Sequence, residues 1–258
     1  MRNVLPPICG GVGPVLNAAL LLLLTGCEKK DEVPVTQQVI VVIDTVSVPP
    51  DAVADFDGNV YSTTVIGNQR WMAENLRSAH YADGDPIPYV PSSNQWVGLA
   101  TGAWSNYDND AAYETFYGKL YNWYAVSDAR NVCPDGWHVP SEADWETLEL
   151  ALGMPVLELD DTGPRGVQAN VGGQLKAEVL WDSPNTGADG SSGFSALPGG
   201  DRISNGSYSG VAQKGSWWSA DEISVTQSRQ RGMTYQVAGV YRTNSVKELG
   251  ASIRCVKD

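Results

Sequence analysis

The sequence Pro140-Ser141-Glu142-Ala143-Asp144-Trp145 gives the clearest folding signal in this chain of 258 residues. A serine that precedes a helix accepts a hydrogen bond from the amide three residues on, and an acidic side chain there returns one. Ser141 and Asp144 fit this capping box, although Glu or Gln is more usual at the second position. An apolar face then repeats at helical spacing through Trp145, Leu148 and Leu152. The pattern predicts a helix that begins after Ser141 and ends at Gly153.

Strand signals lie on both sides of this helix. Residues 60–66 are β-rich, Gly67-Asn68 is a two-residue turn signal, and residues 69–72 continue as the return strand. Residues 251–256 predict a final strand, and residues 120–129 a second, short helix. Two intervening stretches lack a sustained period and predict loops: residues 77–115 and 160–215. We therefore expect an α+β domain over residues 54–258, with short antiparallel strands, two helices and long irregular loops.

The N-terminal apolar segment ends in Leu24-Thr25-Gly26-Cys27. Residues 15–24 are nearly all apolar, too few to span a bilayer but enough for the apolar part of a secretory signal. Small residues followed by cysteine resemble a bacterial lipobox, in which the thiol is acylated and the preceding residues are removed. We expect residues 1–27 to be a lipoprotein signal that anchors Cys27 in a membrane. The alternative is an ordinary cleaved signal with a chance cysteine.

Residues 28–53 are expected to form a tether, because they contain a charged run and several prolines. The charged run Glu28-Lys29-Lys30-Asp31-Glu32 resembles the surface-export signal of lipoproteins from the Bacteroidetes group. It predicts a lipid-anchored outer-membrane protein that is displayed on the cell surface. Residues 39–43 are strong strand formers, so the sequence leaves open whether they pair with the edge of the domain.

Charge and cysteine content limit the partners and the compartment. The net charge of −13 repels phosphate backbones, so nucleic acid is not an expected partner. Cys9 would leave with the signal and Cys27 would be acylated, which leaves Cys133 and Cys255. In an oxidising compartment this pair predicts a disulfide. A metal-binding or catalytic pair of thiols is the alternative.

Several segments together resemble the Fibrobacter succinogenes major paralogous domain, a family of bacterial surface and secreted proteins. One is Ile66-Gly67-Asn68-Gln69-Arg70-Trp71-Met72-Ala73-Glu74-Asn75-Leu76, and another is Cys133-Pro134-Asp135-Gly136-Trp137-His138-Val139-Pro140-Ser141. The others are residues 55–61, 117–126, 193–200 and 253–258. The resemblance spans roughly residues 55–258 in the right order, and it implies no established biochemical activity.

A further resemblance concerns the fold. A helix, Cys133, a short strand through Trp137, a helix with Trp145 and a C-terminal strand with Cys255 look like a C-type-lectin-like fold. In that fold the corresponding bridge ties the first helical region to the last strand. The order Gly-Trp-x-x-Pro-Ser-x-x-x-Trp is also similar to the formylglycine-generating enzyme family, which shares the fold. That chemistry requires a cysteine pair in the active site, whereas both cysteines are expected to be structural here.

The chain has nine tryptophans and eleven tyrosines against three phenylalanines. Such rings combine an apolar face with a polar edge, which suits glycan binding. Four tryptophans lie in regular patterns and are expected in the core: Trp71, Trp123, Trp137 and Trp145. Others lie in looser segments, and the expected ligand-binding residues are Trp181, Trp217, Trp218 and Asp221.

No cofactor is expected, with calcium as the alternative. Residues 55–59 have oxygen ligands at alternate positions but lack the later bidentate glutamate, so we expect a turn there. A lectin-type calcium site would draw on oxygens in the long loop, and its candidates are Asp182, Asn185, Asp189 and Asp201.

Catalysis finds little support in the sequence. His80 and His138 are the only histidines, and neither has zinc-ligand spacing around it. Residues 193–197 differ from a nucleophile elbow because Leu197 stands at the second glycine position. We therefore expect a lipid-anchored, non-enzymatic surface module that binds glycan or protein. The alternatives are a polysaccharide-acting enzyme on the same scaffold and a structural subunit of an outer-membrane assembly.

Overall fold

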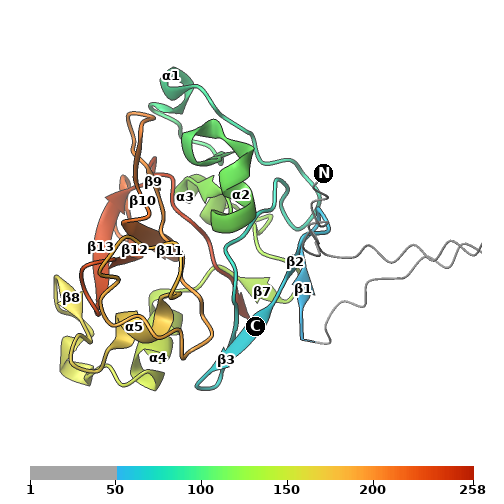
Figure 1. The fold of residues 1–258 in the computed structure, drawn as a ribbon. Helices are drawn as coiled ribbons and strands as arrows, with labels where there is room; N and C mark the ends of the chain where they lie inside the picture. The colour runs from blue at the N-terminus through green and yellow to red at the C-terminus, as the bar shows by residue number, and fades with distance from the viewer. Residues whose placement is uncertain (1–50) are drawn as a thin grey trace, which may run out of the picture. The chain divides into compact units, whose positions relative to one another are not determined.

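The computed structural model describes residues 51–258. The predictions for the signal, for Cys27 and for residues 28–50 of the tether therefore lie outside the described residues. Within residues 51–258, no helix has the length and apolar character needed to cross a membrane. The described part is an α+β domain of short helices and small, mainly antiparallel sheets (Figure 1). The predicted fold class is confirmed.

The described residues form five α-helices rather than the predicted two. They are α1 (Ser93–Trp96), α2 (Ala111–Tyr117), α3 (Trp123–Val126), α4 (Glu142–Ala151) and α5 (Val171–Leu175), with 3-10 helices at Tyr107–Asn109 and Val156–Glu158. The unpredicted helices α1, α2 and α5 have four to seven residues. That is too short for an apolar period to show in the sequence.

Helix α4 has the predicted capping box. The Ser141 side chain accepts from the Asp144 amide, and the Asp144 side chain accepts from the Ser141 amide. The carboxylate of Asp221 on strand β11 (Lys214–Glu222) adds a third acceptor, because its Oδ2 accepts from the Glu142 amide at 2.6 Å. The start of α4 is therefore fixed by its own sequence and by one tertiary contact.

The predicted hairpin belongs to a four-stranded sheet. Strands β3 (Thr63–Ile66) and β4 (Gln69–Met72) pair across Gly67-Asn68 as predicted. Strand β14 (Val256–Lys257) joins β4 to β7 (Trp137–His138), so the chain end closes this sheet. Regular strand begins only at Val256; in the preceding residues Ala251 and Ser252 make isolated bridges. Two small sheets pair β1 (Val53–Ala54) with β2 (Val60–Tyr61) and β5 (Trp104–Ser105) with β6 (Leu120–Tyr121).

The segment 55–59 is the predicted turn. Asp55 Oδ1 accepts from the Asn59 amide at 2.9 Å, and Asp55 Oδ2 accepts from the Tyr61 hydroxyl at 2.5 Å. The Asp55 carboxylate is thus occupied by the turn that leads into β2.

The largest sheet has six strands in the order β10-β9-β11-β12-β13-β8. Besides β11, these are β8 (Pro164–Arg165), β9 (Gly199–Arg202), β10 (Tyr208–Val211), β12 (Gln227–Thr234) and β13 (Val240–Val246). All pair antiparallel except β9 with β11, which are parallel through Gly200 and Gly215. Figure 1 shows its strands, mostly orange to red, at a distance from β1 and β2 within the domain.

Strand β11 separates two hydrophobic clusters. Trp218 packs in a cluster with Tyr121, Ile253 and the two cysteines. Its neighbour Trp217 packs in the other, with Trp71, Trp145 and Phe194. Successive side chains of a strand point to opposite faces, so one pair of tryptophans contributes to both cores.

Cys133 and Cys255 form the predicted disulfide, and both are fully buried. Beside Cys255, Arg254 is also fully buried. Asn75 Oδ1 accepts from Arg254 Nη2 at 2.7 Å and from Trp217 Nε1 at 2.8 Å. The Arg254 guanidinium lies over the Phe194 ring, and burial lowers the Arg254 pKa to about 9. This contact joins three of the segments on which the family resemblance rests.

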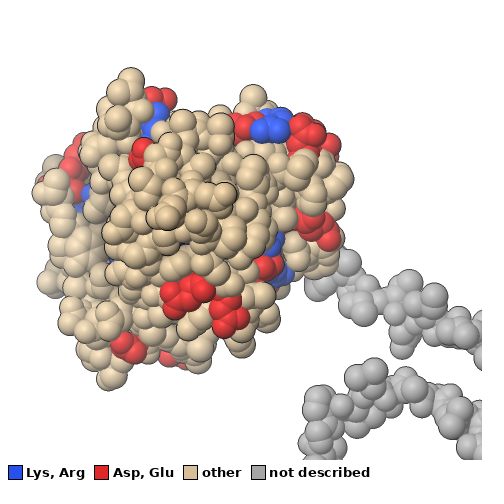
Figure 2. Space-filling model, turned by 90° about the horizontal axis from the view of Figure 1, so that it is seen from above, with Lys and Arg blue, Asp and Glu red and all other residues tan. Residues whose placement is uncertain are grey.

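The surface reflects the acidic composition. On the face drawn in Figure 2, Asp and Glu side chains lie in several separate groups, some of them beside Lys or Arg, and most of the area is uncharged.

Candidate functional site

Two of the predicted ligand-binding residues are buried. Trp217 and Trp218 have no exposed surface, and their indole N–H groups donate to Asn75 Oδ1 and to the Tyr121 carbonyl. Their rings therefore offer no face to a ligand, and assigning them to a binding site is wrong. The cause is the pleat of β11, which a composition argument does not resolve.

Trp181 and Asp221 are partly exposed but have structural partners. Trp181 Nε1 donates to the Ala196 carbonyl at 3.0 Å. Asp221 Oδ2 accepts from the Glu142 amide and from the Ser219 hydroxyl. The structure thus places the four predicted residues at separate positions rather than around one hollow.

The calcium candidates do not converge either. Asp182 accepts from Gln213, Asn185 donates to the Ala177 carbonyl, and Asp189 accepts from Asn170. Asp201 pairs with Lys214 at 2.5 Å. Among residues 51–258, no group of three or more His, Cys, Asp or Glu side chains is arranged to hold a metal ion.

The long loop is instead held by an ammonium group. Lys176 is fully buried, and its Nζ donates to three carbonyl oxygens from separate segments, those of Thr186, Thr234 and Val237, at 2.8–3.1 Å. Burial lowers the Lys176 pKa to about 8. The ammonium therefore joins the loop to the end of β12.

The two histidines contact carboxylates. His138 Nδ1 lies 2.6 Å from Asp258 Oδ1, and its Nε2 lies 3.2 Å from Asp144 Oδ2. The Ser141 hydroxyl donates to Asp144 rather than to His138. His80 Nδ1 lies 2.5 Å from Asp57 Oδ1.

A more coherent candidate site is a hollow of about 180 Å³ on one face of the six-stranded sheet, which we call the sheet-face pocket. Residues paired across antiparallel strands point to the same face. Ser216, Gly232 and Tyr241 form one such row across β11, β12 and β13. Because Gly232 has no side chain, the row is open at its centre.

Neighbouring rows supply the sides of the sheet-face pocket. Gln230 pairs with Thr243 on one side of the glycine row, and Lys214 pairs with Thr234 on the other. Asp201 of β9 completes the lining at the β11 side. On the opposite face of the sheet, Arg231 donates to Glu149 of α4 at 2.7 Å. One face of the sheet is thus packed on a helix, whereas this part of the other face is hollow.

Three side-chain oxygens of residues that line the sheet-face pocket are buried without a hydrogen-bond partner in the protein. They are Asp201 Oδ1, Gln230 Oε1 and Thr243 Oγ1. Asp201 is only 4% exposed and Gln230 9%. Leaving such a group unpaired costs about 1–3 kcal/mol, so a cluster of three in one hollow is energetically expensive unless a ligand or water satisfies it.

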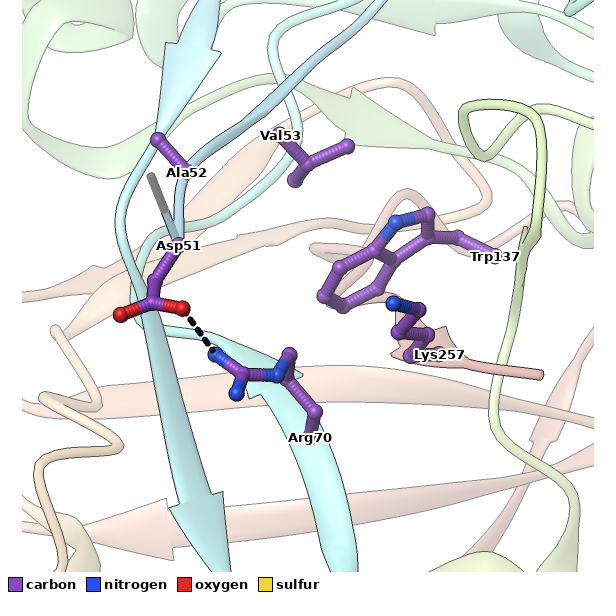
Figure 3. A pocket seen from close by; sticks show the side chains of 6 residues that line it. All are labelled: Asp51, Ala52, Val53, Arg70, Trp137 and Lys257. Atoms are coloured by element: carbon purple, nitrogen blue, oxygen red, sulfur yellow. Dashed lines mark ion pairs between the residues drawn. The ribbon is translucent and has the colours of Figure 1, made fainter. Parts of the chain in front are cut away.

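Two other hollows contain an ion pair, and no unpaired buried side-chain oxygen is found among the described residues that line them. One is lined by Asp51, Ala52, Val53, Arg70, Trp137 and Lys257 (Figure 3). The figure shows Asp51 and Arg70 next to each other on one side, opposite Trp137 and Lys257, and the Asp51–Arg70 ion pair measures 3.4 Å. The second is larger, about 440 Å³, and contains Tyr81, Tyr124 and two prolines. Its charged side chains, Asp128 and Arg130, bind each other at 2.7 Å.

Most of the sheet-face pocket was missed from the sequence. Only Asp201 had been named, as a calcium candidate. No alternation of polar and apolar residues marks these strands, because the charged residues Arg231 and Arg242 lie between the lining positions. Recognising that these strands are neighbours requires the sheet register.

Comparison with known proteins gives one match. The family model described as the Fibrobacter succinogenes major domain matches residues 65–257. No curated protein and no solved structure matches the chain. The narrower C-type-lectin-like assignment stays a prediction.

Proposed function

We propose that this chain, which belongs to the Fibrobacter succinogenes major domain family, is a non-catalytic module that binds a glycan in its sheet-face pocket. We further propose that lipid on Cys27 holds it at the outer membrane with the domain displayed on the cell surface. The charged tether and the apolar N-terminal segment support the second part. The first part rests on the sheet-face pocket.

The observation that supports glycan binding most strongly is the set of unpaired oxygens at Asp201, Gln230 and Thr243. Sugars present several hydroxyl groups on one small ring, and each hydroxyl donates and accepts. The pocket adds the hydroxyl-bearing side chains of Ser216, Thr234 and Tyr241. A glycan unit would satisfy the unpaired oxygens, and the polar lining would set its orientation.

The binding test uses the full chain in a non-glycosidic detergent on a glycan array, followed by calorimetry on any glycan bound. Gly232→Val is the blocking variant. A Cβ at Gly232 meets only Tyr241 Cβ at 3.7 Å and the Gly215 carbonyl at 3.9 Å, so valine projects into the pocket without a backbone clash. We expect it to abolish binding and to leave the unfolding midpoint nearly unchanged, with Gly232→Ala intermediate.

Thr243→Val separates function from stability. It removes an unpaired buried hydroxyl at constant shape, so it should weaken binding and stabilise the fold by about 1 kcal/mol. Thr162→Val, at an exposed position outside the pocket, is the control. Absence of glycan binding, or binding that survives Gly232→Val, would contradict the proposed site. Turnover of a bound oligosaccharide would contradict the non-catalytic part.

Lipid anchoring is tested separately. Cells expressing the chain should incorporate labelled palmitate into it, and Cys27→Ala should abolish the label. Protease treatment of intact cells should then remove the domain if it faces outward. Recovery of the unaltered chain as a soluble, unlabelled protein would exclude the anchor.

A further inference from the structure

We infer that the sheet-face pocket selects a neutral sugar unit over an acidic one, and that Asp201 is the residue that sets this preference. The inference rests on the proposed function and specifies the ligand of the same site.

Charge in the sheet-face pocket is balanced before any ligand arrives. Asp201 and Lys214 are its only charged lining residues, and Lys214 Nζ lies 2.5 Å from Asp201 Oδ2. The charge of the ammonium group is thus offset by Asp201, although its other N–H groups can still donate. A neutral ligand leaves this balance intact, whereas a ligand carboxylate brings a second negative charge to a single cation.

The unpaired atoms require donors from the ligand. Asp201 Oδ1 and Gln230 Oε1 can only accept, and Thr243 Oγ1 can accept or donate. Hydroxyl groups supply such donors, but an ionised carboxylate supplies none. A carboxylate placed beside Asp201 Oδ1 would also be repelled by it at short range, where solvent screening is weak because Asp201 is buried.

Size points to a single ring. The hollow of about 180 Å³ is bounded by side chains on β9, β11, β12 and β13, and the gap at Gly232 spans one position of one strand. One sugar ring fits this space, and the rest of a glycan would extend into solvent. Replacing the hydroxymethyl group at C6 of that ring by a carboxylate therefore changes the charge of the ligand with little change in its shape.

The test compares galactose- and galacturonate-terminated oligosaccharides, and likewise glucose- and glucuronate-terminated ones, by calorimetry on the full chain. We expect the better-bound neutral sugar to bind at least tenfold more tightly than its acidic partner. Added salt should reduce this ratio of affinities only slightly. Asp201→Asn frees Lys214, so it should reduce the ratio at least tenfold or reverse it. Lys214→Met keeps the carboxylate and should widen the preference.

The outcomes separate the two proposals. Equal or stronger binding of the acidic sugars, blocked by Gly232→Val, would overturn the selectivity and leave the glycan site standing. An unchanged ratio in Asp201→Asn, with an unfolding midpoint like that of the parent chain, would remove Asp201 from the role. If Asp201→Asn does not fold, Lys214→Met alone decides, and an unchanged ratio in it overturns the inference. Binding of none of the four would overturn the inference for these sugars, and absence of any glycan bound on the array would overturn the proposed function with it.

Discussion

Removal of the disulfide should cost this domain much of its stability. Cys133 and Cys255 are 122 residues apart, and their bond closes most of the domain into one loop. In the chain-entropy model, a crosslink over a loop of this length stabilises the folded state by about 5 kcal/mol, because it restricts the unfolded chain. Many domains have a total stability of only about 5–15 kcal/mol. Cys133→Ala should therefore remove a large part of the domain's free energy of unfolding.

The measurement is urea unfolding followed by tryptophan fluorescence, with Cys133→Ala, Cys255→Ala, the double variant and the reduced parent chain. Each single variant should lose about 5 kcal/mol, which corresponds to a midpoint shift of about 2 M urea for a typical slope. The double variant should lose little more than either single one, since the second substitution removes no further crosslink. Additive losses, or a parent chain equally stable with and without reductant, would refute the reasoning.

Three other predictions follow from buried or charged groups. Asn75→Ala removes the acceptor of the Trp217 indole and one of the two acceptors of Arg254, which keeps the Phe194 carbonyl. Calorimetry should show a loss of about 3–5 kcal/mol in the free energy of unfolding, and a loss under about 1 kcal/mol would contradict a stabilising role of Asn75. Lys176→Met removes the buried donor that three partly buried carbonyl groups share. We expect a loss of about 3 kcal/mol in urea unfolding and weaker glycan binding, because Thr234 lines the sheet-face pocket. The hydrogen bonds from Arg130 lower the Asp128 pKa from 3.8 to about 2, so its contribution is complete above pH 4 and is lost as the pH falls toward 2. In Asp128→Asn the free energy of unfolding should fall less steeply between pH 4 and pH 2, with no change in slope above pH 4. An unchanged pH dependence between pH 4 and pH 2 would contradict a contribution from the Asp128–Arg130 pair.

The elements predicted correctly depend on neighbouring residues. The capping box at Ser141 and Asp144, the turn at Gly67-Asn68 and the turn at Asp55 each need contacts within six residues. The disulfide is long-range, yet it followed from the compartment and the number of cysteines left to pair. In these cases local chemistry leaves few alternatives.

The site was harder to predict because it depends on register across distant strands. Gly232 opens a hollow only because Ser216 and Tyr241 lie on either side of it, and Asp201 reaches the lining from a strand that pairs in parallel with β11. Trp217 and Trp218 were misassigned for a related reason. Their segment lacks a regular pattern, which favoured a ligand-binding role, but the strand is central in the sheet and both of its faces are covered there.

The position of β11 between the two hydrophobic clusters has a consequence for how the domain opens. Trp217 anchors one cluster and Trp218 the other, so neither half can detach while this strand stays in place. Partial unfolding that spares half of the molecule is therefore disfavoured, and the domain should lose its structure as one cooperative unit. In hydrogen-exchange experiments the β11 amides near these tryptophans should be among the slowest to exchange, with rates that report the global free energy of unfolding.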